Sequence, residues 1–204
     1  MSENEKLEKI KIMALGNNVV GKTSFILRFT ENKFEKIYLA TVGIDYQIKI
    51  VTFKEKRYKL CFYDTVGEEK YRSITLNVIK DAQGILLMYD ITIINSFESI
   101  PNWIKSIKDV KGSDFPMVLV GNKIDLESER KITKEQGEKF AKENGIEFFE
   151  ISNKNGINIQ EAGLALVNKI LEKKEKEKPD AKSINTIVLK NKSKKKKEDS
   201  KRCC

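Results

Sequence analysis

Apolar and polar residues follow two different periods between residues 9 and 172, and these periods predict strands and helices in turn. Strand-like runs occupy residues 9–15, 44–51, 56–64, 84–90, 117–122 and 147–152. Helical spacing of the apolar positions covers residues 24–29, 70–79, 96–110, 133–144 and 158–172. Beyond residue 172 lysine and glutamate dominate and the apolar period stops.

The order of these elements predicts an α/β fold. A short turn at residues 53–55 joins the second and third strand runs, which indicates an antiparallel hairpin. Later strands and helices alternate, which implies right-handed crossovers and a parallel sheet with helices on both faces. Asn158 is expected to cap the last helix, with Glu161 at its third position. Trp103, Phe97 and Ile104 are expected in the core.

Length and charge favour one domain with a basic tail. The 204 residues are enough for one sizeable core and few for two. Of the net charge of +9, residues 182–202 contribute nine basic and two acidic side chains, leaving 30 basic and 28 acidic residues elsewhere. A nearly neutral globular part argues against a nucleic-acid binder, for which a broad basic surface is typical.

The cysteine and histidine content indicates the compartment of the protein and limits the residue types that its site can use. Two of the three cysteines stand at the C-terminal end, so we expect no disulfide framework and a reducing compartment. No apolar run approaches the ~20 residues of a membrane span, and the charged first residues do not resemble a signal peptide, so a cytosolic protein is expected. The chain has no histidine, which excludes imidazole bases and histidine metal ligands.

A phosphate-binding loop is the strongest chemical signal, because one stretch matches GxxxxGK[ST] between a strand and a helix. It consists of Gly16, Asn17, Asn18, Val19, Val20, Gly21, Lys22 and Thr23. The glycines allow a tight turn with inward N–H groups, Lys22 reaches the outer phosphates, and Thr23 offers a hydroxyl to Mg²⁺. The alternative is a glycine turn that caps an ordinary helix, and the flanking elements favour the phosphate loop.

A second candidate motif stands at the end of the third strand run, and ligands gather at strand ends in open parallel sheets. Asp64 begins a DxxG sequence and can hold a water ligand of the Mg²⁺ that Thr23 contacts. Gly67 can bring its N–H to a terminal phosphate. An isolated DxxG is an ordinary turn, and its place after the hairpin gives it weight.

Two further strand ends predict a guanine site. Asp125 can accept hydrogen bonds from both N1–H and the exocyclic amine of guanine, whereas adenine presents a bare acceptor at N1. Lys123 can lay its stem along the base, and Asn122 can connect this loop to the phosphate loop. Backbone N–H groups that suit the guanine carbonyl oxygen belong to Ser152, Asn153 and Lys154. For an isolated NKxD motif, a polar turn with a helix cap is the alternative.

With these motifs, residues 10–171 resemble the Ras-like small GTPases, and among them the Rab family. The Rab-like segments are residues 41–46, 59–65 and 71–74 and the terminal pair Cys203-Cys204. The resemblance implies a three-layer P-loop GTPase fold, with a mostly parallel six-stranded sheet and one antiparallel edge strand. It places the GTPase domain at residues 1–178 and a disordered polybasic tail at 179–204.

The resemblance also implies roles for single residues. Phe34 packs edge-on to guanine, Tyr38 closes over the phosphates, and Thr41 binds Mg²⁺ and senses the γ-phosphate. Nucleotide contacts extend to Ser24 and Leu126. The catalytic set is Lys22, Thr41, Gly67 and Glu68, and the Mg²⁺ ligands are Thr23, Thr41 and Asp64. The segments around Thr41 and Gly67 are the two switches, ordered by GTP and released on hydrolysis.

Several positions depart from the family pattern. Val19 stands where a glycine is usual, so a tight backbone position must accept a β-branched residue. Asn153 replaces an alanine beside the base. Glu68 replaces the glutamine that positions the attacking water, which puts the hydrolysis rate in doubt. The aromatic trio that faces effectors in the family is altered to Tyr46, Tyr63 and Val78.

The tail resembles the Rab pattern for double geranylgeranylation at Cys203 and Cys204. Two lipids suffice for stable anchoring where one is marginal, and nearby lysines add attraction to an anionic leaflet. The alternatives are an unmodified disordered end and a nuclear-localisation-like basic run. The expected location is therefore the cytoplasmic face of endomembranes, with a cytosolic pool.

Together these features predict a Rab-type GTPase that uses GTP/GDP and Mg²⁺ and recruits effectors in vesicle trafficking. The expected partners are an exchange factor, a GTPase-activating protein, a GDP dissociation inhibitor or Rab escort protein, effectors and a membrane, with no nucleic acid. Because of Glu68, a guanine-nucleotide-binding scaffold with little hydrolysis is the alternative.

Overall fold

The computed structural model of the chain describes residues 7–35, 44–65 and 79–177. By its internal contacts the chain forms two compact units, Met1–Ile170 and Leu171–Cys204. The first unit contains the whole sheet and the candidate site.

The first unit is built on a six-stranded sheet in the order β2-β3-β1-β4-β5-β6. Its strands are β1 (Glu8–Leu15), β2 (Ile44–Phe53), β3 (Lys56–Thr65), β4 (Gly84–Asp90), β5 (Met117–Asn122) and β6 (Glu147–Ile151). Only the edge strand β2 is antiparallel to its neighbour, and β1 pairs in parallel with both β3 and β4. The predicted fold class is therefore confirmed.

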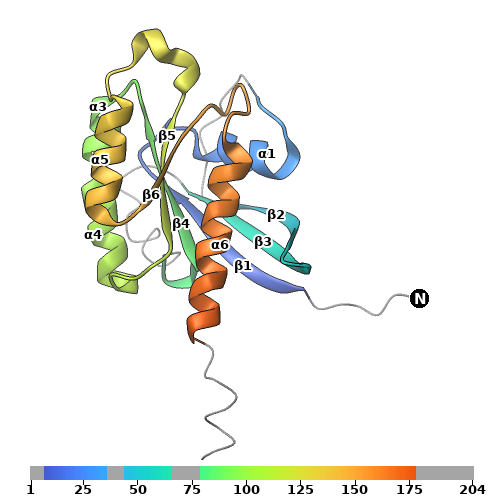
Figure 1. Cartoon of the computed structure of the whole chain (residues 1–204). Helices are drawn as coiled ribbons and strands as arrows, with labels where there is room; N and C mark the ends of the chain where they lie inside the picture. The colour runs from blue at the N-terminus through green and yellow to red at the C-terminus, as the bar shows by residue number, and fades with distance from the viewer. Residues whose placement is uncertain (1–6, 36–43, 66–78, 178–204) are drawn as a thin grey trace, which may run out of the picture. The chain divides into compact units, whose positions relative to one another are not determined.

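Helices cover both faces of this sheet, with α3, α4 and α5 on one face and α1 and the first part of α6 on the other (Figure 1). Their bounds are α1 (Lys22–Glu31), α3 (Ile94–Glu98), α4 (Ile100–Lys111), α5 (Lys134–Asn144) and α6 (Ile159–Glu177), with a 3₁₀ helix η2 (Ile124–Glu129) after β5. The strands β4 and β5 are buried along their full length. Such continuous apolar strands are typical of a parallel sheet covered on both sides.

Close packing holds the helices to the sheet. Phe29 of α1 contacts Phe62 of β3, with ring centroids 5.1 Å apart. A Cβ added to Gly163 of α6 would lie 2.3 Å from the Phe29 ring, so α6 can approach α1 this closely only with glycine there. On the opposite face the predicted core residues Trp103 and Ile104 are buried in a hydrophobic cluster, and Phe97 packs against this cluster.

Three predicted helix details are wrong. The helix expected over residues 96–110 is interrupted at Ser99, because Pro101 lacks an N–H and its ring disfavours a continuous helix. The Asn158 side chain was expected to cap α6, and instead its amide donates to the Glu150 carbonyl over 2.7 Å. The last helix continues past residue 172 to Glu177, since lysine and glutamate are good helix formers even without an apolar face.

Candidate functional site

The loop between β1 and α1 passes so close to neighbouring groups that two of its positions must be glycine. A Cβ on Gly16 would lie 2.1 Å from the carbonyl oxygen of Met88, and one on Gly21 would lie 2.4 Å from Nδ2 of Asn122. Both glycines also have positive φ angles, 147° and 98°. The loop therefore turns tightly into the N-terminus of α1, the geometry that presents backbone N–H groups to an anion.

Val19 adopts a left-handed backbone in the same loop, with φ of 57°. A β-branched side chain in this region is a genuine outlier and carries strain of roughly 1–3 kcal/mol. The side-chain oxygen of Asn18 accepts a hydrogen bond from the Val19 N–H over 3.0 Å, which stabilises the conformation. Val19 stands where the family usually has glycine, and the turn still forms, at the cost of backbone strain.

Asn17 anchors the loop to the helices on the other side of the sheet. Its amide nitrogen donates to Ser99 Oγ over 3.0 Å, and its amide oxygen accepts from the Trp103 indole N–H over 3.2 Å. The expectation that Trp103 lies in the core is correct but incomplete, because its polar edge also holds this loop. The junction between α3 and α4 places both partners of Asn17.

Lys22 folds its side chain back across the loop and is almost fully buried. Its ammonium donates to the carbonyl oxygens of Gly16 and Asn17 over 3.1 and 2.9 Å. Burial lowers the pKa of Lys22 to about 8, and the nearby Asp64 carboxylate offsets part of this effect. A buried cation held at the centre of the loop is well placed to bind a phosphate.

Thr23 and Asp64 meet at the open end of the loop. The Thr23 hydroxyl donates to a carboxylate oxygen of Asp64 over 2.6 Å, and the Asp64 residue is buried at 3% exposure. A hydroxyl and a carboxylate are hard oxygen donors of the kind that Mg²⁺ prefers. Thr23 and Asp64, two of the three residues predicted as Mg²⁺ ligands, therefore fit the ion by their chemistry and proximity.

Two asparagines fasten the loop after β5 and the loop after β6 to the phosphate loop. The Asn122 amide donates to the Val20 carbonyl over 2.8 Å and its oxygen accepts from the Asn153 N–H over 3.3 Å. The Asn153 side chain adds a contact of its own, donating to the Gly21 carbonyl over 2.9 Å. Asn122 thus makes the predicted connection, and Asn153 makes one that the sequence did not suggest.

Asp125 lies between residues of the loop after β6. One carboxylate oxygen accepts from the Ser152 hydroxyl over 2.6 Å, and the Lys154 ammonium lies 3.8 Å from the other. Lys123, which lines the cavity described below, forms an ion pair with the buried Asp90 at 2.7 Å. These contacts hold the carboxylate in one orientation, as base reading requires.

A cavity of about 310 Å³ lies between the phosphate loop and the loops after β5 and β6, which are called the base-side loops here. Its lining residues are Val19, Gly21, Ser24, Phe34, Glu35, Asn122, Lys123, Asp125, Leu126, Asn153 and Lys154. All but Glu35 were predicted from the sequence as nucleotide contacts. The volume is at the lower end of the range for small-molecule sites.

Other predicted site residues lie outside the described residues. They are Tyr38, Thr41, Gly67 and Glu68, together with the lipidation sites Cys203 and Cys204. Their roles stay predictions. Among the described residues, no group of three or more Cys, Asp and Glu side chains could hold a metal ion.

Sequence comparisons decide the family. A sequence model of the Ras family matches residues 11–172. Rab-13 of Bos taurus is 42% identical over 190 residues, which cover 90% of this chain and 94% of the relative. The chain belongs to the Rab proteins of the Ras family. Rab-8 of Diplobatis ommata is 40% identical over 192 residues, covering 94% of this chain and 91% of that relative.

Membership of this family confirms the resemblance expected from the motifs. The Rab protein described here is a small GTPase, which implies binding of GTP, GDP and Mg²⁺ and a role in vesicle trafficking. In the parts of the chain that the structure describes, no helix is long and apolar enough to span a membrane.

Proposed function

We propose that this Rab protein alternates between GTP-bound and GDP-bound states at the cytoplasmic face of endomembranes and recruits effectors while GTP is bound. The observation that carries the proposal is the double connection at Asn122 and Asn153. Their hydrogen bonds join the phosphate loop to the base-side loops around one cavity. A nucleotide whose phosphates contact the phosphate loop and whose base contacts the loops after β5 and β6 can therefore couple the presence of its terminal phosphate to both parts of the site.

Lys22 and the phosphate loop bind the β- and γ-phosphates in this proposal. The ammonium exchanges the carbonyls of Gly16 and Asn17 for phosphate oxygens, which stabilise its buried charge better than neutral carbonyls do. Thr23, Thr41 and Asp64 would hold Mg²⁺. When bound, Mg²⁺ neutralises charge on the phosphates. At the other end of the cavity, Asp125 selects guanine.

The same proposal assigns residues 1–178 to the GTPase domain and residues 179–204 to a lipidated tether. The switches around Thr41 and Gly67 bind the regulators and effectors: an exchange factor, a GTPase-activating protein, and a GDP dissociation inhibitor or Rab escort protein. Tyr46 and Tyr63 stack at 6.2 Å between ring centroids on β2 and β3. Tyr46 is half-exposed, which suits the effector-facing role.

Glu68 makes intrinsic hydrolysis slow in this proposal. Glutamine can both donate to and accept from the attacking water, whereas an ionised glutamate only accepts, and its charge approaches a polyanion. Losing a positioned donor that acts on the transition state typically lowers the rate by ~10²-fold to 10³-fold. If hydrolysis were absent altogether, the protein would act as a GTP-loaded scaffold.

Glu68→Gln is expected to accelerate intrinsic GTP hydrolysis, because the side chain regains a donor for the water. The measurement is single-turnover hydrolysis at matched nucleotide loading, with and without a GTPase-activating protein. Glu69→Gln is the matched control, since it makes the same change one residue away. A Glu68→Gln rate equal to or below that of the unaltered protein would show that Glu68 does not limit hydrolysis.

Replacing both Cys203 and Cys204 with serine is expected to move the protein from the membrane fraction to the soluble fraction of cells. Nucleotide affinity should stay the same, because the cysteines lie far along the chain from the phosphate loop. Cys61→Ala is the control, since it removes the remaining thiol, which is buried in β3. Membrane association that survives in the double variant would assign localisation to the basic residues or to a protein partner.

A further inference from the structure

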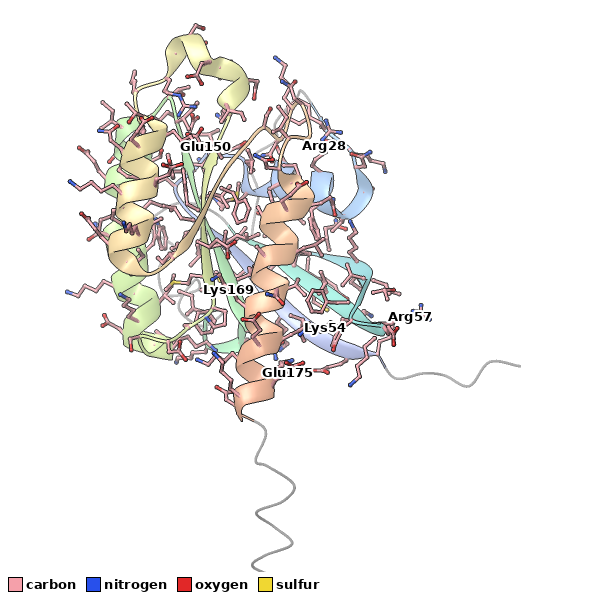
Figure 2. All side chains as sticks on the ribbon, in the orientation of Figure 1. Arg28, Lys54, Arg57, Glu150, Lys169 and Glu175 are labelled. Carbon is pink, nitrogen blue, oxygen red and sulfur yellow. The ribbon has the colours of Figure 1, made fainter. Side chains whose placement is uncertain are left out.

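Arg28 lies on α1 and reaches the loop that follows β6 (Figure 2). Its Nε donates to the Asn153 carbonyl over 2.9 Å, and its Nη2 donates to the Lys154 carbonyl over 2.6 Å. Its Nη1 donates to the backbone carbonyl of Asn32 over 3.0 Å. One guanidinium thus connects the end of α1 to two consecutive peptide groups of the base-side loop.

These two peptide groups belong to the part of the loop that faces the cavity. The Asn153 carbonyl shares a peptide unit with the Lys154 N–H, a predicted donor to the guanine carbonyl oxygen. A cation on the oxygen of a peptide polarises the unit and strengthens its N–H as a donor. Arginine suits this task because its planar fork addresses two acceptors at fixed spacing, which a lysine cannot do.

A second path leads from Arg28 to Asp125. The Lys154 carbonyl shares a peptide unit with the Asn155 N–H, which donates to Ser152 Oγ over 3.0 Å. The Ser152 hydroxyl then donates to the Asp125 carboxylate over 2.6 Å. Every bond in this series is oriented donor to acceptor from the guanidinium to the carboxylate. Arg28 therefore supports the orientation of Asp125 although it does not touch Asp125.

Arg28 also contacts the aromatic residue that lines the same cavity. Its guanidinium carbon lies 6.0 Å from the centroid of the Phe34 ring, the outer limit of a cation–π contact. The one side chain therefore meets the base-side loop and the predicted aromatic neighbour of guanine. A residue whose only task was to cap α1 would need the Asn32 contact alone.

We propose that Arg28 is a positioning residue for guanine recognition. It holds the base-side loop after β6 so that the backbone N–H groups of this loop, and Asp125, meet the edge of the base. The proposal rests on the proposed function, because it requires that the cavity binds a guanine nucleotide. It differs from that function in assigning base discrimination to a residue outside the predicted motifs.

Three nucleotides test the proposal in full-length protein by competition against a fluorescent GDP. GDP is compared with inosine diphosphate, which lacks the amine read by Asp125, and with 6-thio-GDP, which carries sulfur in place of the carbonyl oxygen. In Arg28→Met we expect GDP affinity to fall by about 10-fold to 100-fold, as when a residue that orients ligand-binding groups is removed. Each preference for GDP should fall by about tenfold, the equivalent of one ordinary hydrogen bond.

The ratios separate positioning from folding, because a merely structural loss weakens all three nucleotides equally. Lys33→Met is the control, since Lys33 is an exposed cation just past α1 that pairs with Glu31, and its ratios should match those of the unaltered protein. Arg28→Lys should give intermediate ratios, and it decides the matter if Arg28→Met does not fold. Unchanged ratios in a folded Arg28 variant would overturn the proposal. An unaltered protein without any preference for GDP would instead contradict the proposed function.

Discussion

Asp125→Asn is expected to lower GTP affinity by about 10²-fold to 10⁴-fold and to favour xanthosine triphosphate. Both hydrogen bonds to the carboxylate, each worth about 1.5–3 kcal/mol, are weakened or lost, because the asparagine oxygen is uncharged and the asparagine amide N–H faces the exocyclic amine of guanine. Xanthine presents a carbonyl where guanine has its amine, so the asparagine amide gains an acceptor there. The contacts from Ser152 and Lys154 show that the Asp125 carboxylate is held for such a task. Competition titrations with both nucleotides measure the change.

The control for this prediction is Asp109→Asn, which makes the same change at an exposed position on α4. Its nucleotide preference should equal that of the unaltered protein. Unchanged GTP affinity in Asp125→Asn would contradict the guanine assignment, because that assignment depends on the Asp125 carboxylate.

Lys22→Met is expected to lower GTP and GDP affinity by about 10²-fold to 10³-fold, because removing one partner of a buried, hydrogen-bonded charge pair typically costs about 2–5 kcal/mol of binding free energy. The methionine keeps the length of the side chain but cannot neutralise the phosphates. Because Lys22 is predicted to meet the outer phosphates, affinity for GMP should change far less. Isothermal titration with the three nucleotides gives the comparison.

Lys33→Met serves again as the matched control, since it removes an exposed ammonium from the same region. If Lys22→Met weakened GMP as strongly as GTP, the loss would reflect damage to the loop. The assignment of Lys22 to the outer phosphates would then be wrong.

The fold could be predicted from the sequence because β4 and β5 carry unbroken apolar runs, β2 and β3 alternate apolar and polar residues, and the helices carry the helical period. The hairpin of β2 and β3 followed from two strand runs with a short turn between them. The break at Ser99 was missed because Pro101 fits equally well inside the first turn of a new helix, a position that the apolar period does not mark. The end of α6 was missed because it depends on propensity without an apolar face.

The candidate site was predictable where the functional residues belong to a motif with fixed spacing along the chain. The phosphate loop, Asp64 and Asp125 have that property. The contacts of Arg28, Trp103 and the Asn153 side chain do not, because their partners are backbone or amide groups far away in sequence. Such pairings depend on how elements meet in space, and any residue type supplies a backbone carbonyl. An arginine on a helix or an asparagine in a loop therefore gives no signal alone.

The most direct test of the account is the fate of nucleotide loaded onto the full-length protein in Mg²⁺. GTP and ATP are offered separately, the free nucleotide is removed, and the bound nucleotide is released by acid and identified by chromatography over time. The account predicts stoichiometric retention of GTP, its slow conversion to GDP and phosphate on the protein, and no retention of ATP. Equal retention of ATP, or GTP that stays unconverted with and without a GTPase-activating protein, would contradict it.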